Sequence, residues 1–166
     1  MPISEMEEVT RETIEKGGIL AKLYFDMQSD KTDDLQPIMA DLINNRLLKT
    51  KGVIYCYGNI EEPIKVENVY STSAEVTALF LGLGPLVAVV FNFVPAGIEI
   101  IKPEREMKLK INELQSLMLE LSQISLDYSK YILEKVMNKN DYTKVIEQMR
   151  SREEIGRKLM EKKDQE

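Results

Sequence analysis

The chain has 166 residues, the size of one domain, and its 43% of hydrophobic residues can form a core without disulfides. Its 28 acidic and 22 basic side chains give a net charge of −6, which disfavours nucleic acid as a partner. The sequence has no histidine and one cysteine, which excludes His-based triads, Cys–His pairs and zinc sites of the Cys/His kind. We therefore predict no catalytic residue, no metal ligand and no cofactor.

The N-terminal elements are marked by signals at their ends. Ser4 with Glu7 has the form of a capping box, which opens a helix over residues 4–16, and two glycines follow it. Apolar residues then alternate with polar ones, which predicts a half-buried strand over residues 19–28. Turn residues 29–34 precede a second helix that reaches about Lys49. Its expected core stripe is Leu35, Ile38, Met39, Leu42 and Ile43.

The middle of the chain predicts two paired strands, a buried element and a final strand. Residues 53–58 and 70–79 are rich in β-formers and should pair as a long hairpin. Pro85 after a glycine suits the first turn of a helix, so residues 86–94 are expected to be a short buried helix, with a strand as the alternative. Residues 98–101 form the last strand, closed by Pro103.

Read from residue 19, this order is β-α-β-β-α-β, which predicts an α+β fold of the ferredoxin-like class with both helices on one face of an antiparallel sheet. If residues 86–94 are a strand, the fold becomes an α+β meander. The predicted domains are residues 1–103, including the N-terminal helix, and residues 104–166, a C-terminal helical extension. The expected core of the sheet is Leu23, Phe25, Ile54, Val76 and Ile98.

The C-terminal extension predicts a long helix from Met107 and a last helix that begins after residues 138–141 and frays over residues 161–166. The long helix carries one apolar stripe, made of Ile111, Leu114, Leu117, Met118, Leu121, Ile124, Tyr128, Tyr131 and Ile132. A second apolar face, the seam, consists of Leu119, Ser122, Leu126, Ser129, Leu133 and Met137. A helix that is apolar on two sides is sandwiched, so the seam packs either within a helical hairpin of the monomer or between subunits.

Only residues 78–101 resemble a membrane span in length and hydropathy. Pro85 and Pro95, each beside glycine or alanine, break this segment near both ends, so we predict short buried elements and no membrane partner. Cys56 lies in an apolar run and is expected to be a small buried hydrophobe. With an N-terminus that lacks the pattern of a signal peptide, this predicts a cytoplasmic protein, and the scarcity of cysteine beside many Glu, Lys and Ile residues favours a thermophile.

Sequence similar to an uncharacterised group of archaeal proteins is found in residues 45–53 (NRLLKTKGV), 70–76 (YSTSAEV), 95–100 (PAGIEI) and 114–117 (LQSL). This resemblance implies an archaeal source and transfers no activity. The βαββαβ plan also resembles small-molecule regulatory domains of the ACT type. That family has a glycine-containing effector loop after the first strand, where this chain has residues 29–32 (SDKT).

The polar face of the predicted sheet is the candidate site. Its candidate residues are Lys22, Tyr24, Asp26, Tyr55, Tyr57, Glu75 and Glu99. The expected strand order places three carboxylates on adjacent strands, close enough to bind a hard cation or to perturb each other's pKa. The preferred interpretation is instead a polar face covered by the C-terminal helix or by a second subunit, with the tyrosines filling an interface or supporting a helix laid over the sheet.

Three functions follow from these features. The preferred one is a non-enzymatic interaction or regulatory module that forms a homo-oligomer, or binds a protein partner, through its C-terminal helices. The second is a small-molecule sensor of the ACT type with the ligand at a subunit interface. The third is a histidine-independent enzyme that uses Asp26, Glu75, Glu99 and Lys22.

Overall fold

A computed structural model describes residues 3–31, 34–138, 141–151 and 154. It divides into two compact units, Met1–Leu117 and Met118–Glu166, each of which is described by itself. The division falls inside a long helix, and the boundary expected between residues 103 and 104 stays a prediction. The expected fraying over residues 161–166 lies outside the described residues.

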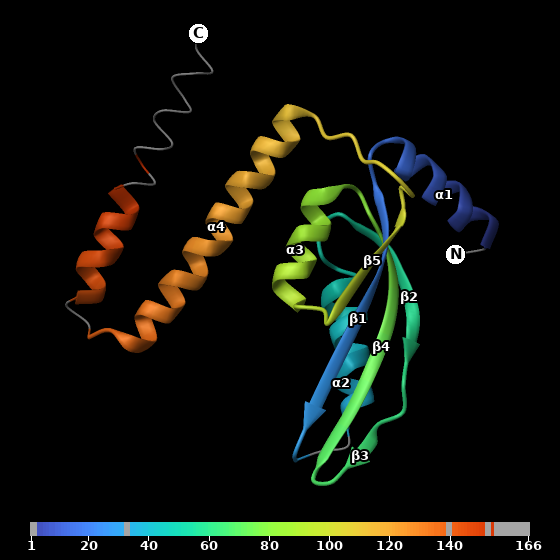
Figure 1. The fold of residues 1–166 in the computed structure, drawn as a ribbon, viewed down its shortest axis with the longest axis horizontal. Helices are drawn as coiled ribbons and strands as arrows, with labels where there is room; N and C mark the ends of the chain where they lie inside the picture. The colour runs from blue at the N-terminus through green and yellow to red at the C-terminus, as the bar shows by residue number, and fades with distance from the viewer. Residues whose placement is uncertain (1–2, 32–33, 139–140, 152–153, 155–166) are drawn as a thin grey trace. The chain divides into compact units, whose positions relative to one another are not determined.

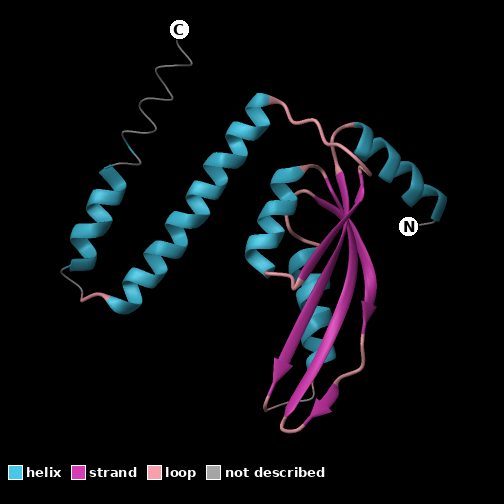
Figure 2. Cartoon of the chain, viewed as in Figure 1, coloured by secondary structure: helices cyan, strands magenta, loops and turns pink. Residues whose placement is uncertain are grey.

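The described residues form an α+β fold with a five-stranded antiparallel sheet and a long helix near the C-terminus (Figures 1 and 2). The helices are α1 (Ile3–Glu15), α2 (Leu35–Asp41), the π-helix η1 (Leu42–Leu47), α3 (Leu83–Phe93) and α4 (Ile111–Val136), and residues 141–151 are also helical. The strands are β1 (Ile19–Ser29), β2 (Val53–Ile60), β3 (Ile64–Val66), β4 (Val69–Phe80) and β5 (Gly97–Lys102).

The strands lie in the order β2-β4-β1-β5, and β3 pairs with β4. The expected hairpin between the second and third long strands is confirmed, since Cys56 lies opposite Ala78 and Tyr57 opposite Thr77. Sequence reasoning missed the three-residue strand β3. β3 lies in the link between β2 and β4 and pairs with the start of β4. The two strands are joined by a two-residue turn after Val66.

The core lies between one face of the sheet and the helices α2, η1 and α3. Its fully buried members from the strands include Leu23, Val76 and Phe80. Three of the five expected strand residues, Leu23, Phe25 and Val76, are confirmed as core. Ile98 is a correction: it is 45% exposed because β5 is an edge strand of the sheet.

The second helix buries most of the expected stripe, with Leu42 partly buried against the core. The buried residues are Leu35, Met39, Ile43 and Leu47, each four positions after the last, whereas Ile38 is 47% exposed. The π-helical segment explains why the buried side reaches Leu47: Leu48 N–H donates to the carbonyl of Ile43 five residues earlier, and a π-turn holds more residues than an α-turn, so Leu47 stays in line with Ile43. Ile38 precedes this segment and lies at the exposed edge of α2.

The apolar segment before β5 is the helix α3, so the alternative of a strand there is wrong. Pro85 lies in its first turn, and Leu86 and Val89 are buried. The helix ends at Val94, whose backbone is left-handed and whose N–H donates to the Val90 carbonyl at 2.9 Å. No helix among the described residues is long and apolar enough to cross a membrane.

The long helix begins four residues later than expected. Glu113 reaches back to the backbone N–H of Lys110 at 3.1 Å, which fixes the N-terminus of α4 at Ile111. Met107, expected in the helix, instead packs against the core of its unit. At 1.5 Å per residue the 26 residues of α4 extend about 39 Å.

The side chain of Asn138 caps the N-terminus of the last helix. Its side-chain oxygen accepts from the backbone N–H of Asp141 at 3.0 Å, and its amide donates to the Asp141 carboxylate at 2.6 Å. A side chain that caps a helix in this way satisfies an N–H group with no partner inside the helix. The expected interruption and new helix are therefore confirmed at this position.

Candidate functional site

The outer face is the face of the sheet that points away from α2, η1 and α3. Directly opposite residues of an antiparallel pair share a face, so the register decides which side chains meet. Tyr24 lies opposite Glu75 on β4 and opposite Gly97 on β5, while Lys22 lies opposite Glu99. This register places Glu75 and Glu99 on the two strands that flank β1.

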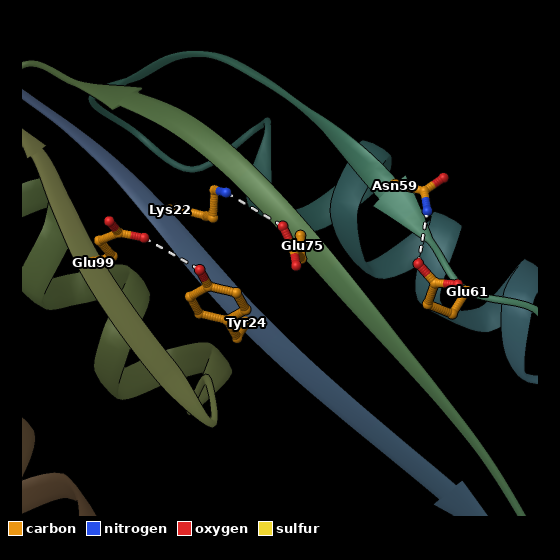
Figure 3. Close-up of polar contacts among 6 residues, drawn as sticks. All are labelled: Lys22, Tyr24, Asn59, Glu61, Glu75 and Glu99. Carbon is orange, nitrogen blue, oxygen red and sulfur yellow. Dashed lines mark hydrogen bonds and ion pairs between the residues drawn. The ribbon is translucent and has the colours of Figure 1, made fainter.

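Two crossed contacts join four of the candidate residues (Figure 3). Lys22 Nζ donates to Glu75 Oε2 at 3.3 Å, and the Tyr24 hydroxyl donates to Glu99 Oε2 at 3.2 Å. Gly97 makes the second contact possible, because a Cβ there would lie 3.2 Å from the Tyr24 ring. Without that side chain the ring lies over β5 and reaches the carboxylate two residues further along the strand.

Each carboxylate of this network is met by one protonated donor. The hydrogen bond and the charge of Glu75 raise the pKa of Lys22, so its ammonium stays protonated. Partial burial, followed by the hydrogen bond to Glu99, raises the pKa of Tyr24, so its phenol stays a neutral donor. Each carboxylate therefore has its own donor. Among the described residues no group of three His, Cys, Asp or Glu side chains converges on a point that can hold a metal ion.

The remaining candidates lie away from this network. Asp26 is exposed opposite Ser73, one step further along β1. Tyr55 and Tyr57 lie on β2, across β4 from β1, and stack on each other with ring centroids 6.1 Å apart. The seven residues thus form a charged group on β1, β4 and β5, a separate tyrosine pair, and one isolated acid.

The tyrosine pair supports a helix, which is α1. Figure 1 shows α1 and α3 on opposite sides of the strands near the start of β1. The hydroxyls of Thr10 and Tyr55 are 2.7 Å apart, and Thr10 donates its own proton to the Met6 carbonyl at 2.6 Å. Since Thr10 has one hydroxyl proton, Tyr55 is the donor to it. Leu79, which lies opposite Tyr55 on the outer face, is fully buried at this covered end.

Two glycines fix the end of α1. Gly17 has φ +95°, and its N–H donates to the Ile14 carbonyl, while Gly18 N–H donates to the Thr13 carbonyl. This pair of bonds is a Schellman motif, in which the left-handed position requires glycine. A Cβ on Gly18 would lie 2.8 Å from the carbonyl oxygen of Phe80, so the helix end sits directly against β4.

Between α1 and the outer face lies a groove of about 820 Å³, here called the α1 groove. It is lined by Met6, Glu7, Thr10, Arg11, Ile14, Glu15, Leu20, Tyr55, Tyr57 and Lys102. The sequence placed both tyrosines on this face and predicted a covering helix, but the expected cover was the C-terminal helix, whereas α1 lies over the tyrosines. The repeat of Met6, Thr10 and Ile14 at intervals of four residues was the available signal.

The second unit carries the predicted seam. Leu126, Ser129, Leu133 and Met137 are half-buried, as are Tyr142, Val145, Ile146 and Met149 in the helical residues 141–151. These two sets indicate that the segments face each other. Leu119 and Ser122, at the other end of the seam, are exposed. On the opposite side of α4, Tyr131 is 61% and Ile132 56% exposed.

A family model matches residues 20–163, and the chain belongs to the MJ0538 family, which is named after a Methanocaldococcus protein. This membership supports the resemblance to an uncharacterised archaeal family. The chain matches no curated protein and no solved structure.

Proposed function

We propose that the chain is a non-enzymatic binding module that associates with a second copy of itself through the exposed apolar stripe of α4. Its exposed members are Met118, Tyr128, Tyr131 and Ile132, at 58%, 51%, 61% and 56%, whereas Leu121 and Ile124 between them are half-buried. A single exposed apolar side chain is ordinary, but a row of them along one side of a helix is typical of an interface.

A second copy suits this stripe because its flanks carry both signs of charge. Asp127 and Glu134 accompany Lys130 and Lys135 along the same stretch of α4. Two such helices in antiparallel orientation place each acid near a base of the partner, and a two-fold axis lets the same patch meet itself. The half-buried seam on the other side is then the intramolecular contact of the hairpin.

The absence of enzymatic activity is part of the proposal. Both glutamates of the network already have donors, and the raised pKa of Tyr24 makes its phenol a poor proton donor near neutral pH. The third function, an enzyme based on these carboxylates, therefore has less support than a binding role.

The ferredoxin-like fold class, the cytoplasmic location and the source of the protein are proposals as well. The order β2-β4-β1-β5 with α2 and α3 as connections supports the ferredoxin-like class, and the same plan is what the ACT-type likeness rests on. Cys56, the only cysteine of the chain, supports a reducing cytoplasmic setting. The archaeal and thermophilic source remains proposed on the sequence resemblance and composition.

The test is light scattering on the purified full chain over a range of concentrations. Wild type should show a mass above that of one chain, and Ile132→Glu should shift the mass to that of a monomer without changing the melting temperature. Ile38→Glu is the matched control, because Ile38 is 47% exposed on another helix, and it should leave the mass unchanged. A wild type that is monomeric throughout, or an equal effect of both variants, contradicts the proposal.

A further inference from the structure

We propose that the α1 groove binds a small planar aromatic carboxylate. The groove has about 820 Å³, within the range of roughly 300–1,000 Å³ in which proteins hold small organic ligands. This site belongs to one subunit and is independent of the association through α4.

The groove is formed before any ligand arrives. Tyr55 in the wall of the groove donates to Thr10, and the glycine pair ends α1 where the backbone lies close to Phe80 of β4. A ligand therefore spends little of its binding free energy on ordering the walls. This preorganisation distinguishes the groove from the open polar part of the outer face.

The walls suit a planar apolar body. Met6 and Ile14 from α1 and Leu20 from β1 supply apolar surface, and the stacked rings of Tyr55 and Tyr57 form an aromatic wall. The centroid distance of 6.1 Å and the angle of 26° between these rings are those of an offset stack, to which a further ring can add. Tyr57 is 53% exposed, so its ring is accessible from the groove mouth.

The charges select an anion with a single charge. Arg11 on α1 and Lys102 on β5 line the groove from different elements. Lys102 is ion-paired with Glu104, whereas Arg11 has no ion-pair partner among the described residues, so Arg11 is the cation available to a ligand. Glu7 and Glu15 also line it, one turn before and one turn after Arg11. One carboxylate can pair with Arg11, whereas a polyanion such as a nucleotide phosphate is repelled by the glutamates.

The experiment titrates the full chain with 2-naphthoate and follows backbone amide shifts by NMR. Shifts should saturate and cluster on the groove residues of α1, β1 and β2. Arg11→Met should weaken 2-naphthoate binding about fivefold, as expected for an ion pair at a partly exposed site, and should leave binding of the neutral analogue 2-naphthalenemethanol unchanged. Lys49→Met, which removes an exposed cation outside the groove, is the control and should change neither probe.

Ile14→Trp gives a second test that does not depend on charge. The indole fills the groove and should abolish the binding of both probes, and as the sole tryptophan of the chain it reports its own burial by fluorescence. Retained 2-naphthoate binding in a folded Ile14→Trp variant, or shifts that cluster outside the groove, would overturn the proposal. An equal loss in Arg11→Met and Lys49→Met would overturn the assignment of the carboxylate contact.

Discussion

The hydrogen bond between Tyr55 and Thr10 anchors α1 to the sheet, and removing the Tyr55 hydroxyl tests this anchoring. Tyr55→Phe keeps the ring and its stack on Tyr57 and removes only the hydroxyl that donates to Thr10 over 2.7 Å. A partly buried neutral hydrogen bond of this kind contributes about 1 kcal/mol, which corresponds to about a fivefold change in an equilibrium constant. Thr10 keeps its bond to the Met6 carbonyl, so the helix itself remains intact.

Hydrogen exchange of the backbone amides measures this effect locally. The amides of α1 should exchange about fivefold faster in Tyr55→Phe, because the helix leaves the sheet more often, while amides of β1 and β4 keep their rates. Tyr57→Phe is the matched control: Tyr57 belongs to the same stack and is 53% exposed, and its loss of a hydroxyl should not change exchange in α1. Unchanged exchange of α1 in Tyr55→Phe, or the same acceleration in both variants, would refute the anchoring role.

Three further predictions concern the core, the polar network and the cysteine. Leu47→Ala should lower the free energy of unfolding by roughly 2–5 kcal/mol because Leu47 is fully buried, whereas Ile38→Ala should change it by less than about 0.5 kcal/mol, as measured by urea unfolding. Since the pKa values of Lys22 and Tyr24 are both raised, their protons are held more tightly in the folded chain. Their contribution to stability should be intact below the ordinary tyrosine pKa of 10.0 and should fall as the pH rises further, and thermal melts of Tyr24→Phe should show a smaller loss above that pH. Burial raises the pKa of the Cys56 thiol, so a thiol reagent should label the native chain at neutral pH more slowly than the unfolded chain; equal rates would contradict this burial.

Much of the fold was predictable because its signals are local. Alternation from Ile19 onward, the glycine pair before it and the proline near the start of α3 each act through neighbouring residues. The register of β1 against β4 and β5 then brought Lys22 and Tyr24 beside the two glutamates. These are the features in which local propensity and tertiary packing agree.

The predictions were wrong where the helix departs from 3.6 residues per turn, or where burial depends on residues far away in the sequence. A wheel of 3.6 residues per turn puts Ile38 in the stripe, although it lies at the edge of the buried side and is 47% exposed. The same wheel misses Leu47, which the π-helical turn brings into line with Ile43. Ile98 alternates correctly, yet the exposure of an edge strand depends on what covers it, which alternation does not encode. The same holds for α1, whose amphipathic spacing predicts a buried side without naming the surface that buries it.

The position of α1 changes how the outer face is understood. Alternation along the strands alone assigns the tyrosines and the carboxylates to a single open site of seven candidate residues. The helix separates them: Tyr55 becomes part of a covered, mostly apolar groove, while Glu75 and Glu99 stay on the open part with their own donors. An aromatic ligand in the groove is therefore insulated from the charge network, and substitutions at Lys22 or Tyr24 should change alkaline stability without changing ligand affinity.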